Sequence, residues 1–80
     1  MNKKTESGSA WKQGDVITIA CDGRSVEGVI LLASKNGASL MIGFEAILHG
    51  HVGMMPLARG DDGVYRSIMD DTEVAISKAH

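Results

Sequence analysis

The chain has 80 residues, a formal net charge of −2 and a hydrophobic share of 44%, which is enough for one small domain. It is too apolar for a disordered chain, and no apolar run is long enough to cross a bilayer, so we expect no membrane partner. Glycine numbers 10, and there is one residue each of Trp, Tyr and Phe. With its many valines and isoleucines, this composition is typical of short strands and tight turns around an aliphatic core.

The chain begins with a polar segment of small residues that shows no hydrophobic periodicity. Residues 1–13, which include Lys3, Lys4 and Lys12, are expected to form a disordered tail, with a single small β-barrel domain over residues 14–80. No apolar run follows the basic residues, so the sequence predicts no secretory signal.

Turn signals divide the domain into six apolar runs. Asp-Gly or Asn-Gly pairs at residues 22–23, 36–37 and 62–63 favour hairpin turns because both residue types tolerate positive φ. Further breaks are expected at residues 49–53 and 69–72. The sequence therefore predicts strands over residues 16–21, 25–34, 38–48, 52–58, 64–68 and 73–77. Pro56 has no amide hydrogen for a ladder, so the fourth strand is expected at a sheet edge.

The second and third strands can pair in two registers. A two-residue loop pairs Lys35 with Ala38, whereas a three-residue loop pairs Ser34 with Ala38. We favour the three-residue loop because it sets Gly28 opposite Phe44 and so makes room for the ring. The core face of the hairpin then carries Val26, Ile30, Leu32, Leu40, Ile42 and Phe44.

The favoured register leaves several aliphatic side chains on the outer side of the hairpin. A solvated antiparallel sheet alternates polar and apolar residues, and contiguous exposed apolar surface marks an interface. The nearby methionine-rich segment of residues 54–57 is also apolar. We therefore expect a homo-oligomer or a protein partner, with the interface candidates Val29, Leu31, Met41, Met54, Met55 and Leu57.

Short strands with a bend at Gly28 resemble a small SH3-like barrel over roughly residues 14–77. Val26-Glu27-Gly28 is similar to the second-strand start of Sm-like RNA-binding proteins, although Ser34 and Ala38 stand where that family places its Asp and Asn. Ser34-Lys-Asn-Gly37 is similar to half of the turn in PilZ-type cyclic-dinucleotide receptors, with Leu32 at the Asp position. The resemblance implies an all-β, SH3-like barrel of five or six short antiparallel strands, and carries over neither family's binding residues.

Two other classes of function stay open. A nucleic-acid-binding barrel would use Lys12, Arg24, Lys35 and Arg66, although the net charge of −4 over residues 15–80 disfavours contact with a phosphate backbone. A small enzyme would need an active site at a subunit interface, where copies of Tyr65, Ser67 or a histidine pair converge.

The histidine pair is His49 and His51, whose spacing places both rings on one side of a strand. They are candidate metal ligands only if a third ligand joins them, for which Asp61, Asp62 and His80 are available. The chain has neither a phosphate-binding loop nor a nucleophile elbow, so we expect no cofactor and a non-catalytic binding or assembly module. Cys21 is the single cysteine, which excludes an internal disulfide and favours a reducing, cytoplasmic setting.

Overall fold

The computed structural model describes residues 11–79, which form six antiparallel strands and no helix that could cross a membrane. The strands are β1 (Val16–Cys21), β2 (Arg24–Ala33), β3 (Ser39–Leu48), β4 (His51–Arg59), β5 (Tyr65–Ser67) and β6 (Glu73–Lys78). Each strand pairs with the next, and β6 returns to pair with β1, so the sheet closes into a barrel. The prediction of a small all-β barrel with five or six short antiparallel strands is confirmed.

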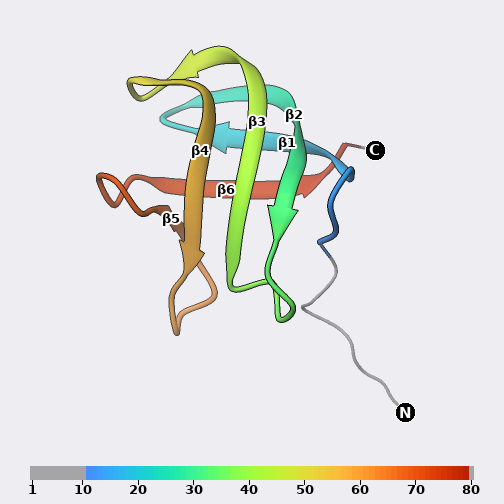
Figure 1. Cartoon of the computed structure of the whole chain (residues 1–80). Coiled ribbons are helices and arrows are strands. Elements are labelled where there is room, and N and C mark those ends of the chain that lie inside the picture. Colours follow the sequence, from blue (N-terminus) through green and yellow to red (C-terminus); the bar gives the residue numbers. More distant parts are fainter. Residues whose placement is uncertain (1–10, 80) are drawn as a thin grey trace.

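The strands form two layers that cross each other. Figure 1 shows β2, β3 and β4 side by side in the front layer, with β1 and β6 crossing behind them in the back layer. Inward side chains of both layers form one core, which contains Ile17, Ile19, Cys21, Ile30, Leu40, Ile42, Phe44, Leu48, Met55, Leu57, Tyr65 and Val74. Trp11 packs against this core, whereas residues 1–10, the larger part of the expected tail, lie outside the described residues.

The tight turns lie where the sequence places its turn signals. Asp22 and Gly23 have φ values of 55° and 78°, the positive angles that a two-residue hairpin turn requires. The third hairpin turns at His49 and Gly50, which also have positive φ, so His51 already belongs to β4. The predicted break over residues 49–53 is therefore shorter than expected.

A β-bulge divides the hairpin of β2 and β3 into two registers. Away from the turn, Gly28 lies opposite Phe44, as the three-residue loop predicts. Next to the turn, Ala33 lies opposite Leu40, as the two-residue loop predicts. The expectation that Leu32 faces the core is wrong, because the extra residue of the bulge turns this side chain outward and leaves it 61% exposed.

Gly28 occupies the place where β2 bends between the two layers. It pairs with Ile17 of β1 on one side and with Phe44 of β3 on the other. A Cβ atom added here would lie 2.4 Å from both the Gly43 carbonyl oxygen and Ile19 Cδ1, so only glycine fits. The space beside Gly28, which was expected to receive the Phe44 ring, is occupied instead by the Gly43 carbonyl oxygen and Ile19 Cδ1.

The prediction that β4 is an edge strand is wrong over its second half. There β4 pairs with β3 on one side and, at residues 57–59, with β5 on the other. The Arg59 amide donates to the Ala38 carbonyl oxygen, and the alternation of strand hydrogen bonds then turns the Pro56 nitrogen away from β3. The Pro56 carbonyl oxygen accepts a hydrogen bond from the Ile68 amide at 3.0 Å. Proline is tolerated because its nitrogen meets only the end of the β5 ladder.

Candidate functional site

An apolar row crosses the outer side of the front layer. Leu32 of β2 pairs with Met41 of β3, and Met41 pairs with Pro56 of β4. Ile68, in the loop after β5, continues the row through its hydrogen bond to Pro56. These four residues border a hollow of about 460 Å³ that no charged side chain lines. Leu32 and Ile68 are each 61% exposed, so the apolar row remains accessible in the folded chain.

A second apolar area lies beside this row. Leu31 covers Gly43, and its Cδ1 lies 3.0 Å from the position that a Cβ of Gly43 would take. Val29 and Met54 are the strand partners of Gly43 on its two sides, and Met54 is 52% exposed. Together with the apolar row, this area forms what we name the outer face: Val29, Leu31, Leu32, Met41, Met54, Pro56 and Ile68.

Four of the six predicted interface residues lie on the outer face, and two do not. Met55 and Leu57 are completely buried, so their assignment to an interface is wrong. The cause is the alternation along β4, which sends residues 55 and 57 into the core and residues 54 and 56 outward. Sequence reasoning missed Leu32, which the bulge turns outward, and Ile68, which lies in a loop.

The two ends of the outer face carry opposite charges. Glu27 and Glu45 are exposed and line a hollow of about 720 Å³ at the end away from the β2–β3 turn. Lys35 is exposed in that turn, at the other end. Arg59 lies near the same turn, because its guanidinium donates to the Asn36 carbonyl oxygen at 3.2 Å. The outer face is therefore acidic at one end and basic at the other, with an uncharged row between them.

The four candidate nucleic-acid-binding residues do not gather in one place within residues 11–79. Arg24 begins the ten-residue strand β2 and Lys35 follows its end, a path of about 30 Å along an extended strand. Arg66 lies 2.9 Å from the Asp62 carboxylate and near a second carboxylate on β6, so its charge is neutralised locally. Lys12 precedes β1. This arrangement provides no continuous basic surface.

The candidate metal ligands His49 and His51 meet carboxylates from other elements. His51 Nε2 lies 3.3 Å from Asp70 Oδ2 and 3.3 Å from Ser67 Oγ. His49 Nδ1 lies 3.7 Å from Asp22 Oδ2, and its Nε2 lies 4.0 Å from Asp70 Oδ2. Even so, no group of three or more His, Cys, Asp or Glu side chains in the described part of the chain is arranged to hold a metal ion.

The same cluster does not have the geometry of a nucleophile relay. In a serine–histidine–aspartate relay the serine and the carboxylate use opposite ring nitrogens, whereas Ser67 and Asp70 both meet Nε2 of His51. Tyr65, also a candidate for catalysis, donates its hydroxyl to the Gly37 carbonyl oxygen inside the protein. These contacts join turns and loops to one another. No sequence signal identifies Asp70 as a neighbour of His51, because it lies 19 residues further on in a different turn.

The remaining reactive group, the Cys21 thiol, is buried. Burial raises its pKa, and the nearby carboxylates of Asp22 and Asp70 raise it further. The thiol therefore stays protonated near neutral pH and is a poor nucleophile, which agrees with its place in the core.

No family model matches the sequence, and neither a curated protein nor a solved structure is significantly similar to it. The resemblances to Sm-like and PilZ-type proteins are thus limited to short fragments.

Proposed function

We propose that the protein is a self-associating binding module, in which the outer face of one copy packs against the outer face of a second copy. The observation that carries this proposal is the apolar row of Leu32, Met41, Pro56 and Ile68, which runs across the front layer without a charged side chain. Contiguous exposed apolar surface of this kind often marks a contact site. Its burial is favourable by about 25 cal/mol per Å² of apolar surface.

A second copy is favoured over an unrelated partner because the charges of the outer face complement each other. A dimer with two-fold symmetry brings the same patch of both copies together. If the two-fold axis lies across the strands, Glu27 and Glu45 of one copy approach Lys35 of the other. If the axis lies along the strands, like charges meet. The charges therefore select the antiparallel arrangement, in which the apolar rows cover one another.

The first experiment is sedimentation equilibrium of the full chain. Concentrations from about 5 to about 500 µM should span the dissociation constant of an interface of modest size. Met41→Glu places a charge in the middle of the apolar row, so we expect it to raise the dimer dissociation constant at least tenfold. Ser77→Glu adds the same charge at an exposed position of β6 in the back layer, away from the outer face, and should leave the constant unchanged. A wild-type chain that stays monomeric at the highest concentration would refute the proposal.

A charge-reversal series tests the orientation. Lys35→Glu alone should weaken the dimer, and so should the double reversal Glu27→Lys with Glu45→Lys. The combination of all three changes restores opposite charges across the interface, so it should recover most of the affinity. If the triple variant is weaker than either parent, the antiparallel arrangement is wrong.

A further inference from the structure

The back layer contains a strand edge that the described residues leave open. Residues 75–78 of β6 pair with β1 on one side. On the other side β6 pairs with β5 only at Glu73 and Val74, because β5 begins at Tyr65. The chain before Tyr65 turns away: the Gly60 amide donates to the Val64 carbonyl oxygen at 2.9 Å. The second half of β6 thus has a neighbouring strand on one side only.

The hydrogen bond at the carboxyl end of β6 shows which backbone groups face the open side. The Ala79 amide donates to the Val16 carbonyl oxygen, so residues 79, 77 and 75 bond to β1 and the alternate residues point away from it. The N–H and C=O groups of Ile76 and Lys78 therefore face the open edge. Within residues 11–79 neither amide has a hydrogen-bond partner on that side.

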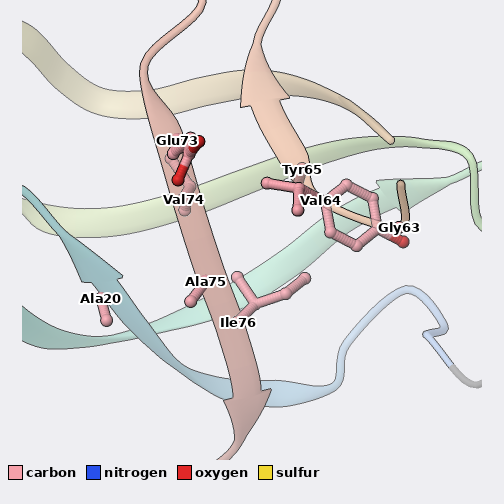
Figure 2. A pocket seen from close by; sticks show the side chains of 8 residues that line it. All are labelled: Ala20, Gly63, Val64, Tyr65, Glu73, Val74, Ala75 and Ile76. Atoms are coloured by element: carbon pink, nitrogen blue, oxygen red, sulfur yellow. The ribbon is translucent and has the colours of Figure 1, made fainter. Parts of the chain in front are cut away.

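An apolar cavity of about 470 Å³ lies along this edge. Figure 2 shows β6 passing through its middle, with Val64 and Tyr65 on one side and Ala20 of β1 on the other. Glu73 is the one acidic or basic side chain that lines it, and 71% of that side chain is exposed. Arg66 lies 3.6 Å from Glu73 and 2.9 Å from Asp62, so these three groups together leave one net negative charge. The cavity thus combines a free backbone edge, an apolar wall and a net negative charge at one end.

We propose that this edge binds an extended peptide segment of another protein, added antiparallel to β6 and in line with β5. Unpaired backbone groups of a strand recognise another strand, and the cavity accepts alternate apolar side chains of that segment. In the antiparallel direction the carboxyl end of the peptide approaches Glu73 and its amino end approaches Lys78. The edge therefore selects a segment with a basic residue near its carboxyl end and an acidic residue near its amino end. The site is separate from the outer face, which lies on the front layer.

Amide hydrogen exchange followed by NMR tests the free edge directly. In the free protein, the Ile76 and Lys78 amides should exchange at least tenfold faster than those of Ala75 and Ser77, which bond to β1. Equal protection of all four amides in dilute protein would overturn the proposal. Protection of Ile76 and Lys78 that rises with protein concentration alone would assign the edge to a second copy, and would overturn it as well.

Binding is tested by fluorescence anisotropy with a probe peptide labelled at its amino end, fluorescein-Glu-Val-Thr-Val-Thr-Lys-amide. This probe should bind the full chain and slow exchange at Ile76 and Lys78. The charge-swapped probe fluorescein-Lys-Val-Thr-Val-Thr-Glu-amide should bind at least fivefold more weakly. A probe that is N-methylated on the amides facing β6 should not bind, because it cannot form the ladder. Equal binding of the N-methylated probe, or no binding of the first probe at millimolar concentration, would rule out strand addition.

A matched pair of variants locates the binding to β6. Lys78→Pro removes an amide that faces only the open edge, so it blocks the ladder without breaking a bond to β1. Lys78→Ala removes the same charge and keeps the amide. We expect Lys78→Pro to weaken binding at least tenfold more than Lys78→Ala does, with the two variants equally folded by circular dichroism. Identical affinities of the two variants would contradict the assignment.

Discussion

The two layers of the barrel share one core, but their outer sides differ. In the front layer the central outward positions of β3 and β4 hold Met41 and Pro56, which pair with each other. In the back layer the paired outward positions of β1 and β6 hold small or polar residues, such as Thr18 opposite Ser77. One core serves both layers, so folding alone does not account for the extra apolar side chains of the front layer. This difference between the two outer sides is the reason for proposing the outer face as a contact surface.

The largest change in the free energy of unfolding is expected from a substitution on the inner side of β3, compared with one on its outer side. Ile42 is completely buried, and its neighbour Met41 lies on the outer face. Ile42→Ala should lower the free energy of unfolding by about 3 kcal/mol, because it leaves a cavity in the core. Met41→Ala should lower it by less than about 1 kcal/mol, because the exposed site leaves no closed cavity.

Guanidinium unfolding at low micromolar concentration measures both values while self-association is kept small. Equal losses for the two variants would mean that the outer side of β3 is packed as tightly as the core. In that case the contrast between the two sides of the front layer would disappear.

A slightly smaller effect is expected at the bend that joins the two layers. Gly28→Ala places a Cβ within 2.4 Å of the Gly43 carbonyl oxygen and of Ile19, so overpacking should cost about 2 kcal/mol. The control is Gly23→Ala in the β1–β2 turn, where φ is 78° and no atom lies within 4 Å of the added Cβ. There only backbone strain acts, at about 1 kcal/mol. A larger loss for the turn variant would show that the layers do not depend on a close approach at Gly28.

Much of the fold could be predicted from the sequence because local signals determine it. The pair Asp22-Gly23 defines a turn by its own backbone preferences, and β1 has the predicted limits of residues 16–21. The bulge in β2 could not be predicted in the same way. Each half of the hairpin satisfies a different register, and apolar residues fill both sides of β2. The hydrophobic pattern therefore does not show that the register changes at Leu31.

The candidate site was predicted in part for the same reason. The sequence holds more apolar residues than one core needs, and this excess predicted an outer contact surface. Which residues of β4 point inward, Met55 among them, depends on how β4 pairs with β3. The contact of His51 with Asp70 and the free edge at Ile76 depend on where distant loops end. Such features arise from tertiary arrangement, and no short sequence pattern encodes them.

A moderate effect is expected where the short strand β5 is tied to the front layer. The Tyr65 hydroxyl donates to the carbonyl oxygen of Gly37, a buried residue in the β2–β3 turn. Tyr65→Phe keeps the ring and removes this bond, so the free energy of unfolding should fall by about 1 kcal/mol. Faster hydrogen exchange in the β2–β3 turn should accompany the loss. Unchanged stability and exchange would show that the turn does not depend on β5.

The smallest effect is expected from a carboxylate at the rim between the layers, and it should depend on pH. The Asp70 carboxylate accepts hydrogen bonds, first from Thr72 and then from Ser67 and His51, and these lower its pKa from the ordinary 3.8 to about 2. A lowered pKa stabilises the fold above the unfolded value, and this stability is lost as the pH falls through the folded value. The free energy of unfolding should therefore decrease between about pH 4 and pH 2, and Asp70→Asn should make that decrease shallower. Added salt should change the difference little, because short hydrogen bonds rather than distant charges cause the shift. If the variant and the wild type lose stability in parallel over this range, Asp70 makes no such contribution.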